Sequence, residues 1–425
     1  MKRAAITALL SVAALIPLST SRAQDPPDST QQQSEALRVF LDCHTRCDFD
    51  HFRREITFVN WVRDRRDAQV HVLVTSQRTG GGGQEFFFDF IGLEEFSSKE
   101  DSLFYVSSTI NTDAEVRDGM TQTLKLGLIP YVANMPIGQQ IGIVYEAPVL
   151  EAQQQVQVTD DPWNLWVLEV GAGGSVSGET RRSDFNINGG FDASRITEDW
   201  KIEFDVGGWY QRRTEELSTG TSAFSDQTWD SELLVVRSLG DHWSTGAKAE
   251  IGSSTFGNLN LAYGAGPAIE YDIFPYDEST RRQIIFLYSV SVARYRYDEI
   301  TLFDEISELR VRQELEIAAR ARQPWGNVNA SMFVGNYLHD FSLHRLSFSG
   351  GLSVRVFRGF NINTNGMISR IKDQISLPRG GVSDEDILLR RRQIGTDFRY
   401  RLRLGFSYEF GSIYNNVVNP RMNRF

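Results

Sequence analysis

The N-terminal third places four possible metal or redox side chains within nine positions: Cys43, His44, Cys47 and His51. His44 adjoins Cys43 and would normally point elsewhere, and a Cys-x-x-x-Cys spacing is not a standard zinc or redox motif. In an exported chain, a single closely spaced cysteine pair is more often a disulfide. We therefore expect a disulfide between Cys43 and Cys47, and we expect no metal or cofactor. Free thiols and a metal site are the alternatives.

A second group of reactive residue types surrounds one turn and contains His339, Asp340, Ser342 and His344. A serine hydrolase needs a nucleophile, a histidine base and a residue that orients the base. No serine motif accompanies this group, and an exposed His-Asp turn is usually a solvated loop. We expect that the protein is not an enzyme, and hydrolysis is the alternative.

Charged residues alternate with apolar ones along extended segments from Leu165 onward. In the run 400–410, apolar residues take most even positions, and arginines stand between them at its start. Such runs are roughly 12 to 18 residues long, whereas soluble strands are commonly about 5 to 6, so they can cross a membrane. One face then suits lipid, and the other suits a narrow lumen that selects polar or ionic solutes. The charges predicted to face this lumen are Lys201, Glu203, Asp205, Glu270, Asp272, Arg310, Arg312, Glu314, Glu316, Arg399, Arg401 and Arg403.

Turn residues divide this region into twelve alternating runs, an even number that is typical of bacterial membrane barrels. The runs cover 165–179, 183–196, 199–213, 226–238, 242–256, 258–274, 282–297, 309–322, 325–338, 343–357, 360–372 and 397–410. The links after even-numbered runs are short, and the long links, 214–225, 298–308 and 373–396, follow odd-numbered runs. This asymmetry is typical of outer-membrane barrels and predicts a periplasmic N-terminal region.

The first residues and the composition indicate export. Lys2 and Arg3 precede an apolar run, and small residues stand at the −3 and −1 positions of a cut after Ala23, so residues 1–23 read as a secretory signal peptide. Residues 24–34 have almost no apolar content and read as a flexible leader.

A net charge of −11 disfavours nucleic acid as a partner. No later run is apolar enough for a membrane helix, which leaves a closed barrel as the spanning structure.

Residues 35–150 have the pattern of a small α/β domain, and 151–163 read as its linker to a barrel over 164–425. Within the domain, the spacing of apolar residues predicts a strand from Leu37 and an amphipathic helix from Asp48 through Val62. It then predicts three strands, near 69–75, 85–91 and 103–108, and a second helix. Thr112 and Glu115 have capping-box spacing at the start of that helix. The glycines 80–83 lie between two strands, so they predict a hairpin turn and not a phosphate-binding loop.

Together, the signal peptide, the alternating aromatic strands and the C-terminal Phe425 resemble the bacterial outer-membrane β-barrel class over about residues 164–425. In that class the barrel-assembly machinery reads the last strand and a terminal aromatic residue. The resemblance therefore implies Tyr408, Phe410 and Phe425 as an assembly signal, with outer-membrane lipid and the assembly machinery as partners. The N-terminal domain is similar, in layout only, to TolB-like periplasmic domains.

The predicted fold is an all-β transmembrane antiparallel barrel of about twelve strands, preceded by a small α/β periplasmic domain. The predicted function is a porin-like narrow solute channel, or an envelope scaffold, in the bacterial outer membrane. Its periplasmic domain could engage another periplasmic protein or the cell wall. The alternatives are a barrel-embedded hydrolase of phospholipase type, and a barrel that only anchors the binding domain.

Overall fold

The computed structural model describes residues 36–133, 135–142, 161–217, 220–380, 393–419 and Arg421. The predicted signal peptide (1–23), the leader (24–34) and most of the predicted linker (151–160) lie outside these residues. Among the helices that are described, none has both the length and the apolar character needed to cross a bilayer.

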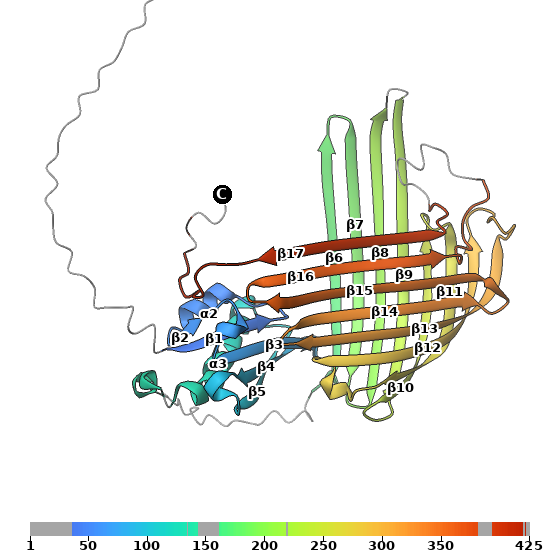
Figure 1. Ribbon diagram of the computed structural model, residues 1–425. Helices are drawn as coiled ribbons and strands as arrows, with labels where there is room; N and C mark the ends of the chain where they lie inside the picture. Colours follow the sequence, from blue (N-terminus) through green and yellow to red (C-terminus); the bar gives the residue numbers. More distant parts are fainter. Residues whose placement is uncertain are drawn as a thin grey trace, which may run out of the picture.

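The N-terminal domain is a five-stranded mixed sheet with two helices (Figure 1). The sheet order is β2-β1-β3-β4-β5, in which β1 is parallel to β2 and β3, and the other pairs are antiparallel. Apolar residues of the sheet and of both helices form one buried core, which includes Phe52, Phe88 and Leu124. The elements are β1 (Leu37–Cys43), α2 (Phe49–Glu55), β2 (Val59–Trp61), η1 (Arg65–Asp67), β3 (Val70–Arg78), β4 (Gln84–Gly92), η2 (Glu94–Phe96), β5 (Glu100–Ser107), α3 (Asp113–Val132) and η3 (Pro136–Gln140).

The first helix is shorter than its apolar spacing predicts. It ends at Glu55, and Val59–Trp61 form the edge strand β2. Ile56 and Val59 are both buried in the same core, so their spacing fits a helix followed by a strand as well as one long helix. The β-branched Val59 favours the extended conformation. The prediction of a helix through Val62 is therefore wrong.

The second helix begins as its sequence predicts. The Thr112 hydroxyl accepts from the backbone N–H of Glu115, and the Glu115 carboxylate accepts from the backbone N–H of Thr112 at 2.7 Å. This reciprocal capping satisfies two backbone donors that the helix itself leaves unpaired. The glycine tract likewise forms the predicted turn between the antiparallel strands β3 and β4.

The rest of the described chain forms one antiparallel sheet of twelve strands, in which every strand pairs with its neighbours in sequence. The antiparallel all-β class, the number of strands and the small α/β N-terminal domain are therefore confirmed. The strands are β6 (Trp166–Glu179), β7 (Arg182–Ile196), β8 (Trp200–Leu217), β9 (Gly220–Ser238), β10 (Trp243–Ser254), β11 (Leu259–Asp272), β12 (Arg282–Tyr297), β13 (Ser307–Gln323), β14 (Gly326–Tyr337), β15 (Asp340–Phe357), β16 (Phe360–Ile371) and β17 (Phe398–Tyr408).

The sheet curls strongly, and its first strands cross its last strands in Figure 1, where β6–β9 are green and β13–β17 are orange to red. Within the described residues, the edge strands β6 and β17 each have one paired neighbour and are not paired with each other. Strand alternation separates two faces. One carries exposed apolar side chains such as Val170, Phe348 and Phe406, and the other carries most of the charged residues.

The predicted long loop at 214–225 is instead an extended hairpin. Strand β8 continues to Leu217, β9 begins at Gly220, and Glu215 pairs with Ser222 in register. The polar, serine- and threonine-rich sequence that suggests a loop is compatible with strands that project beyond the rest of the sheet. The link after β16 is long, as predicted. Its described part contacts the loop between β12 and β13, where the Leu302 N–H donates to the carbonyl of Leu377 at 2.8 Å.

Candidate functional site

A cavity of about 580 Å³ lies on the charged face of the curled sheet, which we call the lumen face. Four of the predicted lumen charges line this cavity, and they come from strands β8, β11 and β13. Lys248 and Glu250 of β10 also line it. These two residues are not among the predicted lumen charges, although they alternate with Ala247, Ala249 and Ile251 in the same way. The four predicted residues in the cavity are Lys201, Glu270, Arg312 and Glu314.

The charges around this cavity are mostly compensated by ion pairs between near neighbours. Lys201 Nζ lies 3.0 Å from the carboxylate of Glu203, and Arg312 Nε lies 3.0 Å from that of Glu314. The Glu270 carboxylate accepts a hydrogen bond from the Tyr276 hydroxyl at 3.1 Å. A wall of this kind can replace part of the hydration shell of a small polar or ionic solute.

One row of carboxylates crosses the first five strands of the sheet. The register places Glu169 of β6, Asp192 of β7, Asp205 of β8, Glu232 of β9 and Glu250 of β10 directly beside one another in turn. Like charges on adjacent strands repel, so such a row needs compensation. Part of that compensation comes from the β10 lysine, whose ammonium contacts Glu232 at 2.8 Å and Glu250 at 3.4 Å.

The loop after β16 is bound to arginines of the lumen face. Asp373 is buried, and its carboxylate contacts Arg312 at 3.2 Å and Arg345 at 3.0 Å. Ile375 packs in a small apolar cluster with Tyr337 and Leu343. The loop is thus fixed across the lumen face by one buried carboxylate between two strand arginines.

Asp272 does not belong to the lumen wall. It is completely buried, and its carboxylate accepts from the backbone N–H groups of Phe274 and Ile284 at 3.1 and 3.2 Å. These bonds close the turn between β11 and β12. Alternation along the strand predicts a lumen charge at this position, but the strand ends there and the side chain serves the turn instead.

The remaining predicted lumen charges lie away from the cavity. Arg310 contacts Glu308 and His339 near the β14–β15 turn. Glu316 is half-buried on β13, outside the cavity lining. Three exposed arginines lie on the edge strand β17, and among the described residues no carboxylate pairs with any of their guanidinium groups. Those three are Arg399, Arg401 and Arg403.

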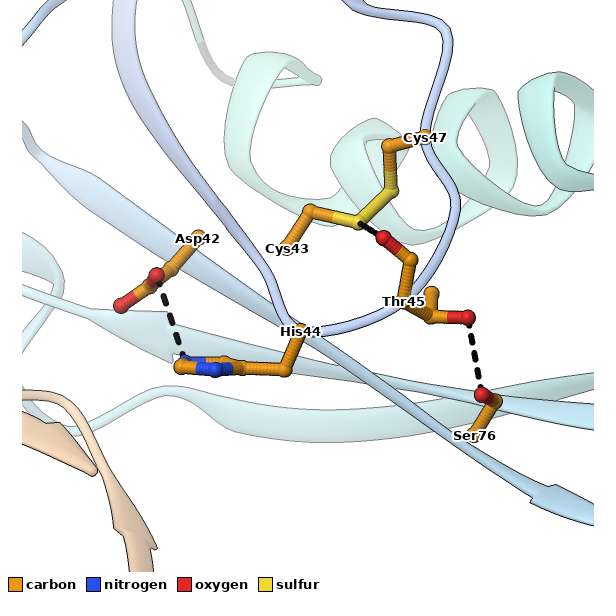
Figure 2. Close-up of a disulfide and its surroundings, with 6 residues drawn as sticks. All are labelled: Asp42, Cys43, His44, Thr45, Cys47 and Ser76. Carbon is orange, nitrogen blue, oxygen red and sulfur yellow. Dashed lines mark hydrogen bonds and ion pairs between the residues drawn. A yellow bond between two sulfur atoms is a disulfide. The ribbon is translucent and has the colours of Figure 1, made fainter. Parts of the chain in front are cut away.

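A disulfide joins Cys43 and Cys47 in the loop between β1 and α2 (Figure 2). His44 of this loop lies 3.4 Å from Asp42, and His51 lies 3.2 Å from Asp118. The two histidines therefore face different carboxylates and do not converge on the sulfur atoms. Across the described residues, no group of three or more such side chains has the geometry to hold a metal ion.

The aromatic residues of the predicted assembly signal lie on and just after the last strand. Tyr408 and Phe410 are exposed, and their rings lie 5.5 Å apart. Phe425 lies outside the described residues. The segment after Phe410 leaves the sheet and turns to the N-terminal domain, where Tyr414 forms a β-bridge with Val62.

The residues of the hydrolase alternative do not form a catalytic triad. His339 contacts Arg310, and the Asp340 carboxylate accepts from the backbone N–H of Ser342. The His344 ring nitrogen lies 3.0 Å from the carbonyl oxygen of Phe341. Each contact belongs to a turn or a strand end. This arrangement gives Ser342 no base with which to become a nucleophile.

No protein-family profile matches the chain. Curated proteins likewise yield no match. Among solved structures, the chain is similar to one described as the CymD monoaromatic hydrocarbon channel, at 9% identity and a TM-score of 0.28, over 59% of this chain and 80% of that one. A superposition of this quality establishes neither a shared fold nor a shared solute.

Proposed function

We propose that the twelve-stranded sheet closes into an outer-membrane barrel through which small polar or ionic solutes pass. The observation that supports this most directly is the cavity of about 580 Å³ lined by charges of both signs. The opposite face of the same strands exposes aromatic and aliphatic residues, as a lipid-facing surface requires. Backbone groups in lipid must all be paired, which an antiparallel barrel achieves.

The mixed charge of the cavity favours small ions and zwitterions over apolar solutes. Its lining holds three basic and three acidic side chains, so a solute with both charges finds a partner for each: Lys201, Lys248, Glu250, Glu270, Arg312 and Glu314. In this proposal the N-terminal domain lies in the periplasm, and residues 1–23 direct export. No catalytic step is part of the proposal.

Electrical recording of the full chain in planar lipid bilayers tests this function, with one variant on each face of the sheet. Ala268→Phe places a ring in the cavity lining and is expected to reduce single-channel conductance at least severalfold. Ala247→Phe lies on the opposite face, one residue from Lys248, and is expected to conduct as the native chain does. Equal conductance of both variants would contradict a solute path through this cavity.

A further inference from the structure

The N-terminal domain contacts the sheet at widely separated points along the end that carries the short turns. In the β3–β4 turn, a Cβ built on Gly80 would lie 2.9 Å from Ile196 at the end of β7, and one on Gly82 would lie 3.5 Å from Val167 of β6. Asp89 lies 3.8 Å from Arg281, in the turn between β11 and β12. The glycine tract therefore allows a close approach to the first two strands.

The same domain also contacts the last three strands. The Asp64 carboxylate accepts from the backbone N–H of Gly359 in the β15–β16 turn at 2.8 Å. Arg358 of that turn pairs with Asp67 at 2.9 Å. Arg63 pairs with Glu409, just after β17, at 2.9 Å. The domain thus reaches from one edge of the curled sheet to the other.

The segment after β17 fastens the domain through its backbone. Asn415 N–H donates to the carbonyl of Trp61 at 2.8 Å, and Arg63 N–H donates to that of Ile413 at 3.1 Å. The Asn416 side-chain oxygen accepts from the Trp61 N–H at 2.6 Å. These bonds cover the outer edge of β2, which would otherwise be the free edge of the domain's sheet.

An ion pair with a buried carboxylate joins the domain to β15. Asp42 of β1 is 6% exposed, and both of its carboxylate oxygens accept from the guanidinium of Arg355 of β15 at 3.1 Å. The guanidinium stacks on the Phe40 ring, 4.4 Å from its centroid. His71 and His44 approach the same carboxylate at 3.3 and 3.4 Å, and Figure 2 shows His44 held beside Asp42 by the disulfide loop.

We propose that the N-terminal domain is a plug that closes the short-turn mouth of the lumen, with the Asp42–Arg355 pair as its latch. A body that contacts both edges and the middle of a curled sheet at one end spans the opening between its walls. A bidentate carboxylate–guanidinium pair is directional, and loss of Arg355 removes a permanent positive charge that compensates the buried carboxylate. The plug role rests on the proposed solute path.

Two measurements on the full-length protein test this proposal together. The first is the yield of a disulfide between Gly80→Cys and Ile196→Cys, which reports docking of the domain. The second is conductance in planar bilayers, which reports opening. Arg355→Met and Asp42→Asn are expected to lower the cross-link yield and to raise the mean current at least tenfold. Arg46→Met is the control, because that side chain is exposed and pairs with Asp113 within the domain.

A cross-link that holds the domain in its docked position completes the test. In the Arg355→Met background, oxidation of the Gly80→Cys and Ile196→Cys pair is expected to return the current to the native level. If the latch variants undock the domain but the current does not change, the plug role is wrong and the solute path stands. If neither the native chain nor any latch variant conducts, both proposals fall. Heat-modifiable gel mobility of each variant excludes a misfolded barrel as the cause of any change.

Discussion

Lys248 is the residue whose charge most directly shapes the lumen. Its ammonium contacts two members of the carboxylate row, and it lines the same cavity as Glu270. At an effective dielectric constant near 20, one unit charge about 4 Å from an ion changes its energy by about 4 kcal/mol, and in water by about 1 kcal/mol. A single lysine can therefore set the preference between cations and anions.

We expect Lys248→Met to raise the permeability of K⁺ relative to Cl⁻ by at least about fivefold, because a change of about 1 kcal/mol corresponds to that ratio. The reversal potential across a KCl gradient measures it. Lys125→Met is the matched control, since Lys125 lies on the N-terminal domain and pairs with Glu55 at 3.7 Å. An unchanged reversal potential in the Lys248 variant would place the ion path elsewhere.

His44 gives the latch a dependence on pH. Burial lowers the pKa of His44, and the positive charges of Arg322, Arg355 and His71 lower it further, against the opposing effect of Asp42. Burial alone would raise the pKa of Asp42, but His71, Arg355 and His44 outweigh it and hold that pKa below its ordinary value. The docked domain thus favours an uncharged His44 beside an ionised Asp42.

We expect the pKa of His44 to rise toward its ordinary value of 6.5 in the released domain, because release removes the positive charges of Arg322 and Arg355. The released form then binds a proton more readily than the docked form. Docking is therefore expected to weaken as the pH falls below about 6.5, by at most about tenfold per unit for one proton. Loss of the Asp42 contribution belongs below the ordinary value of 3.8, outside this range.

The cross-link yield between Gly80→Cys and Ile196→Cys is compared at each pH from 7.5 to 5 in the presence of His44 and of His44→Gln, because thiol oxidation itself slows equally in both as the pH falls. His44→Gln keeps a similar volume without a titrating ring and is expected to lose less yield than the His44 protein toward pH 5. Retention of the full slope in the His44 variant would assign the dependence to another group.

At the scale of elements, β2 is a strand of three residues that depends on partners at both sides. It pairs with β1 on one side, and with the segment after β17 on the other. So short a strand has few hydrogen bonds of its own. Its stability therefore depends on a segment that follows the whole barrel in sequence.

We expect Asn416→Ala to loosen this segment, because the Asn416 side chain bonds the backbone of Trp61 and the side chain of Asn60. Each such bond contributes about 0.5–1.5 kcal/mol, so backbone amides of Trp61 and Arg63 should exchange with solvent up to roughly tenfold faster. Hydrogen exchange followed by mass spectrometry measures this. Amides of α3 serve as the internal reference, and uniform acceleration there as well would indicate a general loss of stability.

Strand positions follow from the sequence because alternation is a local signal that each strand repeats. All twelve predicted runs overlap the observed strands, and the run 282–297 coincides with β12. Tertiary pairing is not local. Arg355 and Asp42 are 313 positions apart, and no periodicity in either strand marks their contact. For the same reason, the spacing of Phe52, Ile56 and Val59 could not show that a helix ends between them.

At the scale of the whole molecule, the two edges of the sheet carry opposite charge on the lumen face. The carboxylate row ends at Glu169 on β6, and β17 carries the three arginines that pair with no carboxylate of the described residues. Open strand edges expose backbone groups that lipid cannot satisfy, at a cost of several kcal/mol each. Closure of β6 on β17 removes both edges and brings the two sets of charges together.

We therefore expect β6 and β17 to pair antiparallel in the outer membrane. Val170→Cys on the outer face of β6, combined in turn with Leu402→Cys, Leu404→Cys or Phe406→Cys on β17, should give one efficient cross-link within a monomer. Leu346→Cys on β15 is the control, because β16 and β17 separate it from the edge. Cross-links that join only two copies of the chain would show that the edges pair between molecules. In that case the lumen of a single chain stays open along one side, and a solute path of the proposed kind requires the dimer.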